Sequence, residues 1–335
     1  MWAPEGVYLD TASYGLPPKP AWDALQAALE DWRAGRTSWE GWCEATERAR
    51  GLFAQLVGVR PEQVAVGGGA SPLVALLAGS LPEATRVLAP DVEFSSLLWP
   101  WVTRGADVRV APLARLADAV DDRTDLVAVS AAQSATGEVA DLDALCEAAA
   151  AHGALVVVDA THGCGWLPQD ATRFDALVCS AYKWLLSPRG TAFLALGERL
   201  LERVRPLAAN WYAAGGAHGA YYGLEMPLPE TAARLDLSPA WFSWVGTAPA
   251  LEVLLEIGID RIHEHDLVLA NRFRAGLGLE PSNSAIVTAE VAGAEGKLRG
   301  AGIRAATRAG SLRASFHVYN TEADVDAALA ALGAG

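Results

Sequence analysis

Short apolar runs of three to six residues alternate with longer Ala- and Leu-rich segments along the first two thirds of the chain. An apolar run without polar alternation is typical of a strand buried on both faces, as in a parallel sheet covered by helices. The runs occupy residues 64–66, 86–89, 108–110, 126–129, 154–159, 176–180 and 191–196. Crossover helices are expected near residues 72–80, 95–103 and 141–152. The pattern predicts an α/β fold with a mainly parallel seven-stranded sheet.

The regular alternation stops in an aromatic, Gly-rich passage between residues 199 and 244, and a long helix is expected at 247–258. The tail then returns to strand and helix patterns, which predicts a small C-terminal α/β domain. We therefore expect a large domain at residues 16–250 and a small domain formed by residues 1–15 and 251–335.

The formal net charge of −14 argues against nucleic acid as a partner, because phosphate binding requires clustered Lys and Arg. The amino terminus lacks the features of a signal peptide, and no apolar stretch is long enough to cross a bilayer. We expect a soluble, cytoplasmic protein without membrane contact. The four cysteines show neither CxxC spacing nor the density of a secreted scaffold, so reduced thiols and no metal site are expected.

Lys183 is one of only three lysines, and it stands where a charged amine is unusual. It follows the apolar run at 176–182 and precedes Trp184, Leu185 and Leu186. Removal of water disfavours the ammonium form and lowers a lysine pKa, which prepares the amine to attack a carbonyl. Lys183 is therefore the first catalytic candidate.

Asp159 ends the most apolar predicted strand, and ligands of open α/β sheets bind at the carboxyl ends of strands. A carboxylate facing a lysine there fits pyridoxal phosphate, whose ring nitrogen must stay protonated while the lysine bonds the aldehyde carbon. The segment from Gly67 to Pro72 supplies a Gly-rich turn, a hydroxyl and a helix start that suit the phosphate. A dinucleotide site is disfavoured, because Pro72 interrupts the expected glycine spacing.

These residues resemble the class V pyridoxal-phosphate aminotransferases of fold type I, and the resemblance spans nearly the whole chain. It is carried by the opening segment 8–13, the turn at Ala70 and Ser71, segment 93–101, segment 130–137, segment 159–163 and the lysine motif 180–184. The resemblance implies the cofactor-binding residues Ala70, Ser71, Phe94, Gln133, Asp159, His162, Ser180, Tyr182 and Lys183.

By the same resemblance, Asp159 pairs with the pyridine nitrogen, Lys183 forms the Schiff base and His162 lies beside the ring. Gly246 and Thr247 resemble a segment that a neighbouring subunit contributes to the phosphate, which implies a homodimer with shared active sites. Arg313 resembles an arginine that clamps the carboxylate of an amino-acid substrate, a task suited to its planar fork.

The last cysteine, Cys179, lies in an apolar strand, so persulfide-forming cysteine desulfuration is disfavoured. The passages 207–216 and 233–250 resemble ergothioneine-biosynthesis carbon–sulfur lyases of this class, which implies cleavage of hercynylcysteine sulfoxide to pyruvate and ammonia. Asn210, Trp211 and Tyr212 would then bind substrate, and aromatic faces would suit its quaternary ammonium group.

Three alternatives stay open at this point. They are a class V aminotransferase, an amino-acid epimerase, and a non-catalytic module that kept the fold. Core or dimer packing explains the aromatic residues of 211–244 equally well.

Overall fold

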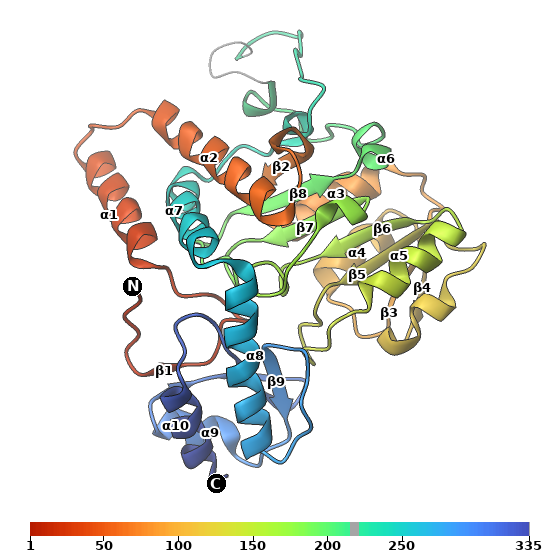
Figure 1. The fold of residues 1–335 in the computed structure, drawn as a ribbon. Helices are drawn as coiled ribbons and strands as arrows, with labels where there is room; N and C mark the ends of the chain where they lie inside the picture. Colours follow the sequence, from red (N-terminus) through yellow and green to blue (C-terminus); the bar gives the residue numbers. More distant parts are fainter. Residues whose placement is uncertain (215–220, 335) are drawn as a thin grey trace.

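A seven-stranded sheet forms the centre of the molecule in the computed structural model, which describes residues 1–214 and 221–334 (Figure 1). The strand order is β2-β8-β7-β6-β5-β3-β4. All neighbouring pairs are parallel except those of β8, which runs antiparallel to β7 and β2. The bounds are β2 (Val64–Gly67), β3 (Arg86–Pro90), β4 (Asp107–Ala111), β5 (Leu126–Ser130), β6 (Leu155–Asp159), β7 (Ala176–Ser180) and β8 (Ala192–Leu196). The predicted mainly parallel sheet is confirmed.

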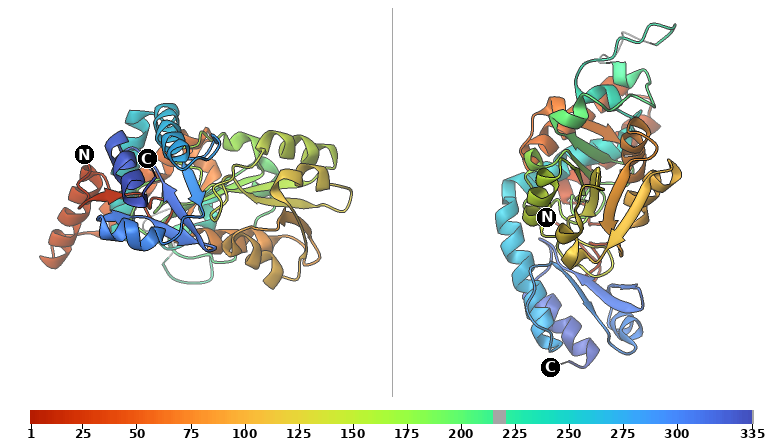
Figure 2. Two further views of the ribbon diagram at one scale, coloured as in Figure 1. Left: turned by 90° about the horizontal axis from the view of Figure 1, so that it is seen from below. Right: turned by 90° about the vertical axis from the view of Figure 1, so that its right-hand side faces the viewer.

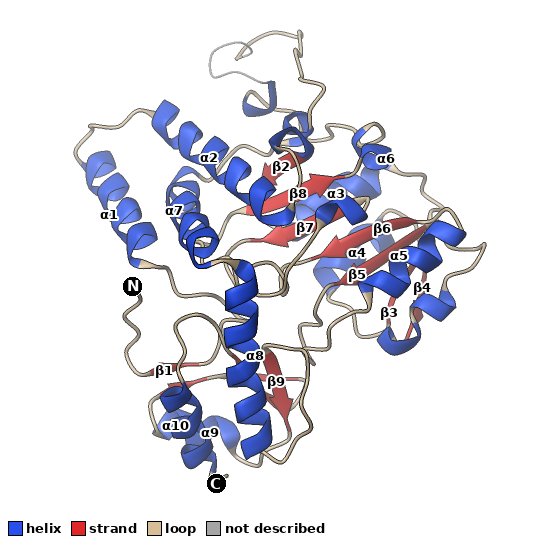
Figure 3. Ribbon diagram, viewed as in Figure 1, coloured by secondary structure: helices blue, strands red, loops and turns tan. Residues whose placement is uncertain are grey.

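Helices cover both faces of this sheet (Figure 3). Within a strand, alternate side chains enter two separate cores, as Val127 and Ala128 of β5 do. One core contains side chains of α3 (Ala70–Ser80) and α4 (Ser95–Thr103). The other contains side chains of α2 (Trp39–Val57), α5 (Leu142–Ala151) and α7 (Trp241–Ile257). Burial on both faces explains why the strands read as uninterrupted apolar runs. Two further helices are α1 (Lys19–Arg33) and α6 (Glu198–Leu201).

The C-terminal elements form a smaller α/β unit with its own core, seen at one end of the molecule in Figure 2. An antiparallel sheet has the order β11-β12-β9, and N-terminal β1 pairs in parallel with β10. The bounds are β1 (Val7–Tyr8), β9 (Ile286–Ala289), β10 (Ile303–Arg304), β11 (Ala306–Arg308), β12 (Ser311–Ser315), α8 (Ile259–Gly276), α9 (Ala294–Gly300) and α10 (Glu322–Leu332). The division at residue 250 stays a prediction, and it falls inside α7.

The chain turns sharply between α7 and α8, by 80° at Gly258, whose φ of 90° favours glycine. In the described part of the chain, no helix by itself has the length and apolar character needed to cross a membrane, whereas α7 and α8 satisfy that test only as a bent pair.

The edge strand β2 is covered by a buried ion pair. Arg50 of α2 contacts Asp236 at 2.6 Å and also donates to the Val64 carbonyl at 2.6 Å. Asp236 accepts a hydrogen bond from the Val66 amide at 2.9 Å, and Leu237 N donates to the Val66 carbonyl. Burial raises the pKa of Asp236 to about 6, although Arg50 opposes this effect. The pair therefore satisfies backbone groups that an open edge would leave unpaired.

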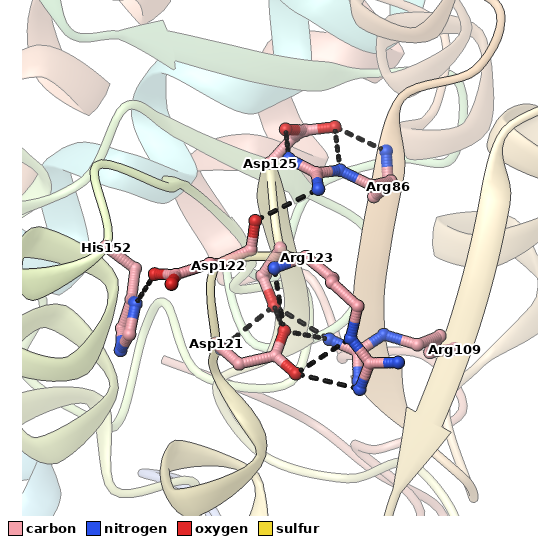
Figure 4. A network of polar contacts seen from close by, with 8 residues as sticks. Arg86, Arg109, Asp121, Asp122, Arg123, Asp125 and His152 are labelled. Atoms are coloured by element: carbon pink, nitrogen blue, oxygen red, sulfur yellow. Dashed lines mark hydrogen bonds and ion pairs between the residues drawn. The ribbon is translucent and has the colours of Figure 1, made fainter.

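A second polar network lies at the amino ends of β3 and β5 (Figure 4). Arg86 forms an ion pair with Asp125 at 2.5 Å. The Asp121 carboxylate forms ion pairs with both Arg109, at 2.8 Å, and Arg123, at 2.9 Å. These side chains are partly exposed, so each pair contributes modestly. The network joins neighbouring strands at the sheet edge opposite to the carboxyl ends of β6 and β7.

We predict that Arg50→Met lowers the free energy of unfolding by about 3 kcal/mol, because it leaves the Asp236 carboxylate buried without its cation. Arg33→Met is the matched control, since Arg33 forms an exposed pair with Glu30 and its loss should cost less than about 1 kcal/mol. Urea unfolding of both variants measures the difference. An equal loss of unfolding free energy in both variants would show that the buried pair stabilises the fold no more than the exposed pair does.

Candidate active site

A pocket of about 120 Å³ opens at the carboxyl ends of β6 and β7. Asp159 is the last residue of β6, Ser180 is the last residue of β7, and Lys183 follows in the segment that leads to β8. The lining comprises Gly68, Gly69, Ala70, Ser71, Phe94, Ser96, Ser130, Asp159, Thr161, His162, Ser180, Tyr182, Lys183 and Arg189. Eight of the nine cofactor residues predicted from this chain's own motifs thus meet in one place, and Gln133 is the exception.

The amine of Lys183 is almost fully withdrawn from water. The residue is 7% exposed, and Nζ lies 5.7 Å from the ring centres of both Phe94 and Tyr182. Burial lowers the pKa of Lys183 to about 8, although the Asp159 carboxylate acts in the opposite direction. Near pH 7 a larger fraction of this amine is therefore neutral than in a solvated lysine, and the neutral amine is the form that acts as a nucleophile or base.

His162 is the direct partner of this amine. Its Nε2 lies 2.7 Å from Lys183 Nζ, and burial together with the lysine charge holds the pKa of His162 well below its usual range. A neutral ring accepts a hydrogen bond from the lysine amine at Nε2 and carries its own hydrogen on Nδ1. That Nδ1 atom is buried without a partner among the described residues. The ring therefore offers one unused hydrogen-bonding atom within the site.

Asp159 lies on the floor of the pocket. Its Oδ1 accepts a hydrogen bond from the Thr161 amide at 2.8 Å. Burial raises the pKa of the carboxyl, and the Thr161 hydrogen bond and the Lys183 charge only partly oppose this. A buried carboxylate is stabilised by a cationic partner. A protonated ring nitrogen would be such a partner.

The opposite side of the pocket suits an anion. Gly68 and Gly69 lead into the first turn of α3, where Ser71 presents a hydroxyl at the helix amino terminus. Ser180 fixes this turn, since its hydroxyl accepts a hydrogen bond from the Ala70 amide at 3.0 Å. Arg189 adds positive charge at the rim, with its guanidinium 4.9 Å from the Tyr182 ring centre. The two segments together would form a cradle for a phosphate group.

Phe94 stands at the pocket mouth and is held by its neighbour Glu93. The Phe94 amide donates to Glu93 Oε1 at 2.7 Å, and Ser130 and Gln133 also donate to the same carboxylate. Gln133 is thereby turned toward Glu93 and does not line the pocket. The predicted cofactor contact of Gln133 stays a prediction, since its amide nitrogen donates to Glu93 while its Oε1 atom is buried without a partner among the described residues.

Gly246 and Thr247, predicted to contact the phosphate of a neighbouring subunit, lie within α7. Thr247 is 0% exposed, and its hydroxyl donates to Ser243 O at 2.8 Å within α7. A Cβ added to Gly246 would lie 2.8 Å from Pro188 Cγ. Both residues pack inside their own chain in this structure, and their predicted contact with the phosphate of a second copy stays a prediction.

Arg313 is held by protein groups beside the pocket. Its side chain is 1% exposed and donates to the Ser134 carbonyl at 2.7 Å and to the Ser13 hydroxyl at 2.9 Å. Burial lowers the pKa of Arg313 to about 10, and its charge in turn lowers the pKa of Lys183. Its predicted role as a carboxylate clamp stays a prediction, since its outer nitrogens already have partners.

Asn210, Trp211 and Tyr212 lie in a separate cluster and do not line the pocket. Trp211 packs edge-to-face on Trp39 of α2 with ring centres 5.4 Å apart, and the Tyr212 hydroxyl donates to Glu47 at 2.6 Å. Asn210 donates to the Asp236 carbonyl at 2.8 Å. The role of these three residues in binding substrate stays a prediction.

Sequence reasoning assigned no role to Glu93, Thr161 and Arg189. Glu93 belongs to segment 93–101 and Thr161 to segment 159–163, both of which resemble the family. Their position in these segments is the only sequence signal for a role in the site. Arg189 lies six residues after Lys183, in a Ser-Pro-Arg-Gly turn. The role of each of these residues follows only from the contacts that it makes in the folded structure.

Comparison with known proteins assigns the family. The family model described as aminotransferase class-V matches residues 7–292. The chain belongs to the class V aminotransferases. It is accordingly an enzyme that depends on pyridoxal 5′-phosphate, as the site already indicated.

This class V chain is 28% identical over 334 residues to an uncharacterized aminotransferase, YcbU, of Bacillus subtilis, covering 92% of this chain and 88% of that protein. It is 30% identical over 266 residues to isopenicillin N epimerase of Streptomyces clavuligerus, covering 71% and 65% respectively. Probable cysteine desulfurases and kynureninases also match. Among solved structures, the cystine C–S lyase C-DES with its product cysteine persulfide aligns with a TM-score of 0.87 at 20% identity, covering 98% and 97% of the two chains.

The residues of this class V enzyme fit the cofactor. Asp159 would hold the ring nitrogen, because a buried carboxylate whose pKa is raised requires a cation. Ser71 and Arg189 would hold the phosphate, and Lys183 would bond the aldehyde carbon. Phe94, 47% exposed at the mouth, would cover one face of the ring.

We predict that Lys183 in the cofactor-free enzyme reacts with an amine-specific reagent with a pH midpoint near 8. Asp159→Asn should lower this midpoint by about one unit, because the aspartate charge favours the ammonium form. Peptide mapping by mass spectrometry measures both midpoints, with Lys19 and Lys297 as internal references. A Lys183 midpoint above about 10 would indicate a solvated amine.

Proposed function

We propose that the chain is a carbon–sulfur β-lyase that acts on a cysteine conjugate. The observation that carries this proposal is a pocket with a partly neutral lysine and no thiol. Cys164 and Cys179 are fully buried, and no cysteine belongs to the pocket lining. Burial raises the pKa of Cys179 well above its usual value, so it is a poor persulfide-forming nucleophile. This argues against cysteine desulfuration by a protein thiol.

The residues have distinct tasks in such a reaction. Lys183 removes the α-proton of the substrate, and His162 accepts a hydrogen bond from the amine and so orients it. Bound pyridoxal phosphate supplies the electron sink that makes the α-proton acidic. Asp159 would hold the positive charge of the ring nitrogen. The β-carbon–sulfur bond then breaks, and water converts the remaining three-carbon fragment to pyruvate and ammonium.

The proposed substrate is hercynylcysteine sulfoxide, from which the sulfur group leaves as a sulfenic acid that a thiol reductant converts to ergothioneine. Support comes from the likeness of segments 207–216 and 233–250 to ergothioneine lyases, and from the absence of a thiol in the pocket. The likeness in fold to the lyase C-DES is compatible with this chemistry.

Transamination and epimerisation are the competing functions, favoured by the names of the relatives from Bacillus subtilis and Streptomyces clavuligerus. Both begin with removal of the same α-proton but leave the substrate carbon–sulfur bond intact. Dependence on an added keto acid identifies an aminotransferase. Loss of chirality without pyruvate identifies an epimerase.

We predict that the purified enzyme releases pyruvate from hercynylcysteine sulfoxide, and that Lys183→Ala lowers the rate by at least about 10³-fold because the base is lost. Lys19→Ala is the control, since Lys19 pairs with Asp23 at the surface. A coupled lactate dehydrogenase assay detects the pyruvate. No release above the Lys183→Ala background would exclude this lyase reaction.

We also propose that the enzyme is a homodimer in which segment 221–226 contacts the second copy. Tyr222, Leu224 and Met226 of this segment are largely or fully exposed, and an exposed apolar segment is typical of an interface.

For the dimer, we predict that a double substitution of Leu224→Asp and Met226→Asp weakens self-association at least about 100-fold, because charges replace two apolar side chains that the proposed interface would bury. Val110→Asp is the matched control, since Val110 is an exposed apolar residue on edge strand β4. Sedimentation equilibrium measures the mass. A wild-type mass of 35.2 kDa at micromolar concentration would refute the dimer.

A further inference from the structure

The turn that carries Lys183 has a strained backbone. Leu186 has φ of 55°, a left-handed conformation that a bulky side chain rarely adopts. Its amide donates to the Lys183 carbonyl at 3.1 Å and so closes a tight turn. Such a residue costs about 1–2 kcal/mol, and it persists only where the surroundings fix it. The contacts that fix this turn therefore also fix the lysine.

The backbone on either side of the turn is tightly packed. The Gly15 amide donates to the Tyr182 carbonyl at 2.9 Å, and a Cβ on Gly15 would lie 2.1 Å from Lys183 O. A Cβ on Gly165, whose φ is 110°, would lie 2.2 Å from Trp184 O. Glycine is required at both places. Each of these contacts restrains the backbone of residues 182–184.

His317 adds a side-chain contact from the C-terminal unit. It follows β12 in the chain, is 0% exposed, and its Nε2 lies 3.0 Å from the carbonyl oxygen of Trp184, the residue after Lys183. Its Nδ1 lies 3.0 Å from Oδ2 of Asp266 on α8. The ring also packs edge-to-face against Trp184, with ring centres 5.3 Å apart.

The chemistry of these two contacts fixes the hydrogens. A carbonyl oxygen only accepts, so Nε2 of His317 must carry a hydrogen and donate it to Trp184. Nδ1 then faces a carboxylate oxygen, and one further hydrogen lies between these two atoms. The pair is neutral overall, which makes its complete burial tolerable. Asp266 thus orients His317, and His317 restrains Trp184.

We propose that His317 is a positioning residue that holds the strained turn of Lys183 through the Trp184 carbonyl. The inference relies on the proposed role of Lys183 but not on the identity of the substrate. His317 and Asp266 belong to the segment after β12 and to α8, so the lysine is coupled directly to the C-terminal unit. His162 and Asp159, by contrast, contact or face the lysine from the large sheet.

Two conservative variants separate this role from general packing. His317→Gln retains an N–H donor near the position of Nε2, whereas His317→Asn retains one only near Nδ1. His265→Gln is the matched control, since His265 of α8 also contacts a backbone carbonyl at 3.1 Å, but that of Asn320 and not that of Trp184. Circular dichroism verifies that each holoenzyme is folded.

Hydrogen–deuterium exchange of the peptide that contains residues 182–187 is the main measurement. We expect its exchange to rise at least about tenfold in His317→Asn, and to stay within about threefold of wild type in His317→Gln and His265→Gln. In the lyase assay, kcat should fall about 10- to 100-fold in His317→Asn with KM changed less than about twofold, because the amine is misplaced after substrate has bound.

Equal exchange at 182–187 in all variants and wild type would overturn the proposal, whatever their thermal stability. Equal impairment of His317→Gln and His317→Asn would also overturn it, because the Trp184 hydrogen bond would then not be the cause. If the wild-type enzyme releases no pyruvate, the proposed lyase function fails, and the exchange comparison still decides the role of His317.

Discussion

The withdrawal of one amine from water is the constraint on which the rest of the site depends. Lys183 is placed between a buried strand and an apolar turn, and burial alone would lower its pKa further than the value of about 8. The Asp159 carboxylate opposes that shift, and Arg313 adds to it. The balance leaves the lysine able to hold or release a proton near neutral pH. Every nearby charge therefore acts on the reactivity of the same nitrogen.

The sheet and the central residues were predictable because their signals are local. A strand covered on both faces must be apolar at every position, so β5, β6 and β7 are visible as continuous runs. Asp159 and Lys183 break that pattern at strand ends, which singles them out and places them together by the geometry of parallel strands. The predicted start of α7 at residue 247 lies six residues after the observed start at Trp241. The sequence gives no signal for the earlier start, because the run at 241–246 lacks an N-terminal capping residue and its helix is stabilised by packing instead.

Other features were unpredictable because they depend on partners far along the chain. Glu93 organises Ser130 and Gln133 from 37 and 40 residues away, and no pattern within its own segment reveals this. Thr247 matched a family motif, yet its hydroxyl is used inside α7. Trp211 also matched by resemblance, but its packing on Trp39 places it away from the pocket. Motif likeness predicts residue type and order, whereas burial decides which groups are available.

The apolar residues that follow Lys183 also offset the cost of placing it there. Depressing a lysine pKa from 10.5 to about 8 corresponds to roughly 3 kcal/mol, and the left-handed Leu186 adds about 1–2 kcal/mol. Complete burial of Leu185 and Leu186 contributes about 1.5–3 kcal/mol each, and Trp184 adds to that. The turn before β8 then presents Arg189 to the same pocket, and antiparallel β8 returns the chain to the sheet. A single connection thus positions the amine, stabilises its strained turn and supplies charge for the phosphate.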